Sequence, residues 1–138
     1  MMLISYGTRP EYIKIKPILD VFKGEIPPVE DNIHRLYIQN GPNRLDSIVA
    51  SVLNNEDIFK NVTSVMVQGD TTSAFAIALA AFHRKIPVLH LEAGLRTYDL
   101  DHPYPEEFNR QAISRLAAYN LCPTARAYSH VECERTPG

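Results

Sequence analysis

The chain has 138 residues, of which 45% are hydrophobic and 22% are charged, so it suits one globular domain and not an extensively disordered chain. Fourteen basic and sixteen acidic residues give a formal net charge of −2, which argues against general nucleic-acid binding. Two cysteines are too few for a disulfide framework or a zinc site, and they indicate a reducing, cytoplasmic compartment. The longest apolar run, residues 74–82, is too short to cross a bilayer, and no secretory signal is visible. We therefore expect neither a nucleic acid nor a membrane among its partners.

Short β-rich runs alternate with helical patterns along the chain, which predicts βαβ units and a parallel sheet. The expected strands are residues 2–5, 36–38, 62–67, 87–91 and 120–122. A first helix is expected to begin after Thr8 and to end before Gly24. Further helices are expected at residues 45–53, 73–83 and 106–117. The predicted fold class is therefore α/β, with a parallel sheet flanked by helices.

The turn after the first strand is a candidate anion site. Gly7 is followed by a predicted capping box formed by Thr8 and Glu11. Free N–H groups at a helix start attract anions, and Arg9 adds a forked donor that suits phosphate. Lys14 lies about one helical turn further on and is placed to reach the same anion. A capped helix with a solvated Arg9 is the alternative interpretation.

Two carboxylates follow expected strands, at the sheet edge where ligands bind in open parallel sheets. Asp70 comes after the third strand and is the N-cap of the next helix, a functional carboxylate, or both. Glu92 ends the fourth strand, where a partly desolvated carboxylate suits acid/base chemistry. A salt bridge between Glu92 and Arg96 is the alternative.

Residues 92–105 form the longest stretch without an expected element, and loops of this length in compact domains are usually functional or disordered. Glu106 and Glu107 open the helix that follows. They either compensate the helix dipole, or one of them supplies a carboxylate on a loop that covers the substrate. The five histidines show no metal-ligand spacing and are interpreted as ordinary polar or core residues. The sequence also lacks the glycine motifs of dinucleotide and Walker-type nucleotide sites.

These same residues resemble the N-terminal domain of the non-hydrolysing UDP-N-acetylglucosamine 2-epimerases. The matching stretches are residues 7–11 (GTRPE), 68–73 (QGDTTS), 90–97 (HLEAGLRT) and 105–110 (PEEFNR). The resemblance implies a Rossmann-like domain at residues 1–126, one half of a two-domain architecture of the glycosyltransferase-B type. The second domain is expected to be absent from this chain, and residues 127–138 are expected to form a poorly ordered tail.

The resemblance also implies an isomerase that interconverts UDP-GlcNAc and UDP-ManNAc for cell-envelope polysaccharide biosynthesis, without a metal or nicotinamide cofactor. In that reaction UDP is eliminated with loss of the C2 proton and then adds back on the other face. The matching positions imply that the acid/base carboxylates are Asp70, Glu92 and Glu106, and that Arg9 and Lys14 contact the nucleotide-sugar. The match leaves open which carboxylate takes the C2 proton.

Two departures from the family pattern bear on function. The Gly-Gln-His-like motif expected after the second strand is missing, because residues 39–41 (QNG) run almost directly into the helix at Leu45. A βα portion is therefore expected to be deleted. We also expect the chain to bind the nucleotide-sugar weakly without a second domain. A homo-oligomer or a complementing chain would supply that domain. The alternatives are a non-catalytic or split-half module that docks onto a partner chain, and a glycosyltransferase donor domain, which leaves the carboxylate motifs unexplained.

Overall fold

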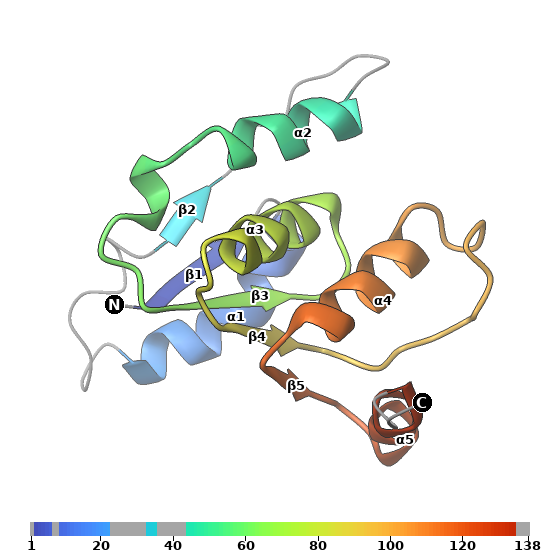
Figure 1. Cartoon of the computed structure of the whole chain (residues 1–138). Coiled ribbons are helices and arrows are strands. Elements are labelled where there is room, and N and C mark those ends of the chain that lie inside the picture. Colours follow the sequence, from blue (N-terminus) through green and yellow to red (C-terminus); the bar gives the residue numbers. More distant parts are fainter. Residues whose placement is uncertain (1, 7–8, 23–32, 36–43, 135–138) are drawn as a thin grey trace.

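The computed structural model describes residues 2–6, 9–22, 33–35 and 44–134. It contains one five-stranded sheet in which every neighbouring pair is parallel and the strand order is β2-β1-β3-β4-β5 (Figure 1). The strands are β1 (Met2–Tyr6), β2 (Ile33–Arg35), β3 (Ser64–Gln68), β4 (Val88–Leu91) and β5 (Tyr119–Leu121). This sheet confirms the predicted α/β class. The second strand was expected at residues 36–38, which lie outside the described residues.

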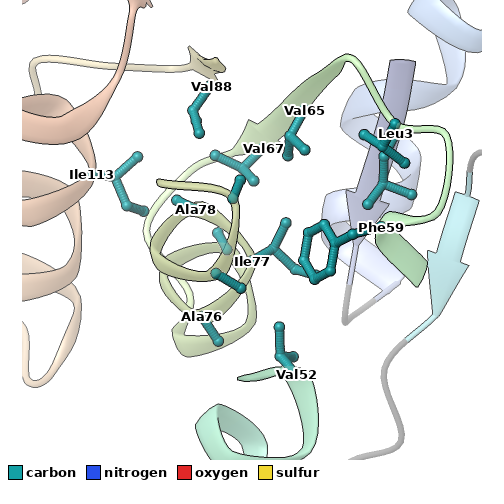
Figure 2. Packing of buried hydrophobic residues seen from close by; sticks show 14 of the residues in the cluster. Leu3, Val52, Phe59, Val65, Val67, Ala76, Ile77, Ala78, Val88 and Ile113 are labelled. Carbon is teal, nitrogen blue, oxygen red and sulfur yellow. The ribbon is translucent and has the colours of Figure 1, made fainter. Parts of the chain in front are cut away.

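Helices cover both faces of the sheet. They are α1 (Arg9–Phe22), α2 (Arg44–Leu53), α3 (Thr72–His83), α4 (Glu106–Leu116) and α5 (Ala125–Glu134), with a short 3-10 helix at Asp57–Phe59. The strand side chains alternate between faces. Leu3, Val65 and Val67 pack with α2, α3 and α4, whereas Ile4 and Met66 pack with α1 (Figure 2 shows the first group). The expected helices at residues 45–53, 73–83 and 106–117 agree with the structure to within one residue at each end.

The central helix α3 explains how three helices fit on one face. Its alanines are almost all fully buried, and Ile77 at its centre is also buried (Figure 2). Small side chains let α3 approach the sheet closely and let α2 and α4 pack on either side of it. The helix is capped by Thr71, whose side-chain oxygen accepts a hydrogen bond from the backbone N–H of Ala74 at 3.1 Å. The alternative that Asp70 is the N-cap is therefore wrong, and its carboxylate is free for other contacts.

The prediction of a poorly ordered tail from residue 127 is wrong for residues 127–134, which belong to α5. The apolar signal of this helix is weak because only Ala127 and Val131 are buried. The helix is capped by Thr124, whose side-chain oxygen accepts from the N–H of Ala127 at 3.1 Å. Polar contacts to the loop after β4, described below, hold its far end. Residues 135–138 lie outside the described residues.

No helix among the residues that the structure describes is both long enough and apolar enough to cross a membrane.

Candidate active site

The candidate site lies at the carboxyl ends of β3 and β4, beside the start of α4 (Figure 1). Gly69 follows β3 with a φ of 76°, which turns the chain so that Asp70 comes directly before Thr71, the N-cap of α3. Glu92 follows β4 with a φ of 61°, a left-handed conformation that is uncommon for a residue with a side chain. Such conformations cluster at functional sites, which supports Glu92 as a candidate site residue.

Glu92 is held by donors from two elements. The ammonium of Lys14, on α1, donates to both carboxylate oxygens at 3.1 and 3.3 Å. The side-chain amide of Gln68, buried at the end of β3, donates to the same carboxylate. The alternative pairing with Arg96 is wrong, because the buried guanidinium of Arg96 binds Glu134 of α5 through two hydrogen bonds of 2.9 Å. The ion pair between Lys14 of α1 and Glu92, which follows β4, keeps this carboxylate at the edge of the site.

Asp70 is half-buried beside α4. One carboxylate oxygen lies 3.4 Å from a guanidinium nitrogen of Arg110, and the side-chain amide of Asn109 donates to the backbone carbonyl of Asp70 at 3.0 Å. Burial raises the pKa of Asp70, Arg110 lowers it, and the charges of Glu106 and Glu92 raise it. Glu92 and Glu106 are therefore each close enough to Asp70 to influence its pKa. A carboxyl group with a raised pKa exchanges a proton more readily near neutral pH than an ordinary aspartate does.

Glu106 and Glu107 have separate environments, although they are neighbours in the first turn of α4. Glu106 is half-buried and lines a cavity of about 340 Å³ together with Arg44 of α2, Tyr104 and the start of α3. Glu107 is fully buried, and its oxygens accept hydrogen bonds from protein donors that include Arg110. Glu106, and not Glu107, is therefore the member of this pair that faces open space.

The predicted anion site is only partly described. The turn at Gly7 and Thr8 and the side chain of Arg9 lie outside the described part of the structure, and α1 begins at Arg9. Lys14 is exposed and reaches Glu92. The ammonium of Lys14 thus lies at the edge of the site, paired with the carboxylate of Glu92.

His90, one of the five histidines interpreted as ordinary polar or core residues, lies in the core, and the contact it makes bears on the site. Its ring is fully buried on β4, with Nε2 2.7 Å from the backbone carbonyl of Gly69 and Nδ1 3.4 Å from the hydroxyl of Ser114. Burial lowers the pKa of His90, and the hydrogen bond to Gly69 opposes this. A neutral imidazole therefore donates to Gly69 and supports the turn that carries Asp70.

Sequence reasoning assigned no role to three residues that contact the site: Gln68 and Arg110 bind the carboxylates of Glu92 and Asp70, and Asn109 binds the backbone carbonyl of Asp70. Each lies inside a stretch that matches the family motif, which was the signal available for them. The described residues contain no group of three or more His, Cys, Asp or Glu side chains able to hold a metal ion.

The parallel α/β sheet defines a Rossmann-like domain, and its candidate site is a group of carboxylates and a lysine near the carboxyl edge of the sheet. Comparison with known proteins identifies its family. The sequence profile of the UDP-N-acetylglucosamine 2-epimerases matches residues 19–137, and the chain belongs to this family.

Relatives and solved structures agree with this assignment. The UDP-N-acetylglucosamine 2-epimerase of Salmonella borreze is 37% identical over 151 residues, which cover 91% of this chain and 40% of the relative. The UDP-N-acetylglucosamine 2-epimerase of Campylobacter jejuni is also 37% identical, over an alignment that covers 91% of this chain and 39% of the relative. A crystal structure of the Neisseria meningitidis UDP-GlcNAc 2-epimerase bound to UDP-GlcNAc has a TM-score of 0.84 at 33% identity, covering 99% of this chain and 44% of that one.

The chain spans about 40% of the length of the curated relatives it matches. The alignments extend over 144 to 163 positions, more than the 138 residues of this chain, so the relatives carry residues within the matched region that this chain lacks. The absence of these residues agrees with a shortened region in this chain. The segment at residues 39–41, where the deletion was predicted, lies outside the described part of the structure.

Proposed function

We propose that this chain supplies the acid/base part of a UDP-N-acetylglucosamine 2-epimerase, which inverts C2 of the sugar in UDP-GlcNAc to give UDP-ManNAc. The observation that carries the proposal is the gathering of Asp70, Glu92 and Glu106 at the sheet edge of a chain that belongs to this family. The N. meningitidis relative, whose structure holds UDP-GlcNAc, supports the choice of substrate.

The chemistry needs more than one carboxylate. One group removes the proton from C2 while the C1–oxygen bond to UDP breaks, and a C1–C2 double bond forms. UDP then re-forms its bond to C1, and C2 receives a proton on the face opposite to the one that lost it. A single carboxylate cannot serve both faces of the flat intermediate, so a site with several proton carriers suits inversion.

We assign the roles by environment. Asp70, whose pKa is raised mainly by burial, keeps a proton to a higher pH than an ordinary aspartate does, which suits it to proton transfer. Lys14 carries a positive charge at the mouth of the site, where it stabilises the negative charge of the departing UDP together with Arg9. Glu92 and Glu106 are then the partner carboxylates.

The test is deuterium exchange at C2, followed by proton NMR of UDP-GlcNAc incubated with the chain in D₂O. The chain is measured alone and mixed with the remaining part of the N. meningitidis relative, and Asp70→Asn is the control. We expect deuterium at C2 in at least one of these arrangements and its loss in the Asp70→Asn control. No exchange in either arrangement would contradict the proposal.

A non-catalytic module that docks onto a partner chain is the second candidate function, and the residues missing from the matched region favour it. It predicts that the chain binds the remaining part of a relative without restoring exchange. Binding measured by analytical ultracentrifugation, combined with the NMR result, separates the two functions.

A further inference from the structure

The buried carboxylate of Glu107 lies next to the candidate site without facing it. It accepts hydrogen bonds from the backbone N–H groups of Thr97 and Tyr98, each at 3.1 Å, and from the side chain of Gln111 at 2.7 Å. It also forms an ion pair with Arg110, in which two guanidinium nitrogens each lie 2.6 Å from the same Glu107 carboxylate oxygen. Glu107 thus joins the loop after β4 to helix α4 and fixes one edge of the Arg110 guanidinium.

The other edge of the same guanidinium faces Asp70. A nitrogen of Arg110 lies 3.4 Å from a carboxylate oxygen of Asp70, and Arg110 itself is buried. A planar guanidinium that is bound by Glu107 on one edge has little freedom to turn away on the other. Asn109, the preceding residue on α4, binds the backbone carbonyl of Asp70, so the helix holds both the main chain and the side chain of this residue.

We propose that Arg110 is a positioning residue, oriented by Glu107, that fixes the carboxylate of Asp70 for its part in the reaction. Only the role of Asp70 in catalysis rests on the proposed function. The arrangement of Glu107, Arg110 and Asp70 stands on the geometry alone.

Charge gives this arrangement a measurable consequence. Burial raises the pKa of Asp70, and Arg110 is the largest influence that lowers it. Without the guanidinium, the pKa of Asp70 rises further and the carboxylate form is lost at a higher pH. A purely structural link between Glu107 and Arg110 would leave the titration of Asp70 unchanged.

The experiment is a carboxyl ¹³C NMR titration of the full chain labelled in its aspartate side chains, with Asp70→Asn to identify the signal. Arg110→Gln is compared with Arg110→Lys, which keeps the charge. The matched control is Arg115→Gln, an exposed arginine on the same helix. We expect an upward shift of the Asp70 midpoint in Arg110→Gln, a smaller one in Arg110→Lys, and none in the control.

Removal of Arg110 alone leaves Glu107 buried without its charged partner, which can prevent folding. The double variant Glu107→Gln with Arg110→Gln removes both charges and gives a second measurement of the same shift. An unchanged Asp70 midpoint in a folded variant would overturn the proposal. Failure of the double variant to fold would also overturn it, since the pair would then be structural.

Kinetics give an independent readout. In the exchange assay, we expect the Arg110 variants to lower kcat with little change in KM and to move the acidic limb of the pH profile to higher pH. The NMR titration needs no substrate. An Asp70 shift in a chain that shows no exchange, either alone or mixed with the remaining part of the relative, would contradict the proposed function and leave the positioning role standing.

Discussion

Two connections leave the same edge of the sheet, and they position their carboxylates in different ways. The connection from β3 to α3 is residues 69–71, and the one from β4 to α4 is residues 92–105. Both begin in the left-handed region, with Gly69 in the first and Glu92 in the second. Glycine adopts this conformation freely, whereas a residue with a side chain pays about 1–2 kcal/mol.

The short connection needs few anchors because the helix cap and the turn define its path. The long connection is instead tied down by side chains of two helices: Glu107 binds Thr97 and Tyr98, and Glu134 binds Arg96. His130 of α5 adds a contact of 2.8 Å between its Nδ1 and the carbonyl of Gly94. A long loop can therefore hold a carboxylate at the sheet edge as a tight turn does, provided that side chains of neighbouring helices anchor the loop.

The largest expected effect comes from breaking the anchor at Glu107. Glu107→Ala removes the acceptor of two loop N–H groups and leaves Arg110 buried without this partner, so we expect a loss of about 3–5 kcal/mol in the free energy of unfolding. Urea denaturation measures this loss. The neighbouring Glu106→Ala, at a half-buried position, is the control and should cost less than about 1 kcal/mol. Equal losses in the two variants would refute the anchoring role.

The same anchor predicts a pH dependence. Burial acts to raise the pKa of Glu107, but hydrogen bonds from Gln111, Thr97, Arg110 and Tyr98 outweigh it and lower the pKa from 4.5 to about 2. A lowered folded-state pKa stabilises the protein fully above the unfolded value, and this contribution is lost as the pH falls towards 2. We therefore expect the stability difference between the natural chain and Glu107→Gln to be largest near neutral pH and to shrink below pH 4.5.

Gly94→Ala tests the anchoring by α5. Gly94 has a φ of 93°, and a Cβ at this position would overlap the backbone of Ala127 in α5. The helix must therefore move, and its contacts with Arg96 and Tyr98 are strained or lost. We expect a loss of about 3 kcal/mol in unfolding free energy together with loss of helical signal in circular dichroism. A change below about 1 kcal/mol would show that α5 does not hold the loop.

Gly69→Ala is the matching change in the short connection, and its expected effect is smaller. A Cβ there would lie 3.6 Å from a carboxylate oxygen of Glu92, which is an ordinary contact. Only the left-handed backbone, with a φ of 76°, opposes the substitution, so the expected cost is about 1–2 kcal/mol. Denaturation of the two glycine variants side by side measures the difference. A larger loss for Gly69→Ala than for Gly94→Ala would reverse the comparison between the two connections.

The sequence predicted the short connection better than the long one, for a physical reason. Strand ends and helix starts are local signals, so the positions of Asp70 and Glu92 at the sheet edge followed from the pattern around them. The partner of Arg96 lies 38 residues away in a helix with only two buried apolar side chains, and no local pattern indicates it. For Glu107, helix-dipole compensation was one local explanation, but its burial depends on how the loop folds over α4.

The smallest expected effect on stability accompanies a large expected effect on activity. Lys14 is 54% exposed in its pair with the 32% exposed Glu92, and exposed pairs contribute about 0–1 kcal/mol. Lys16, on the same helix and also 54% exposed, pairs with Asp20 at 2.9 Å and is the matched control. We expect Lys14→Met and Lys16→Met to change the unfolding free energy by less than about 1 kcal/mol each. If Lys14 stabilises the departing UDP, only Lys14→Met lowers the rate of C2 exchange, by about a hundredfold or more. An equal rate of C2 exchange in the two variants would show that the charge of Lys14 plays no part in the reaction. Its pair with Glu92 would then be an ordinary surface contact.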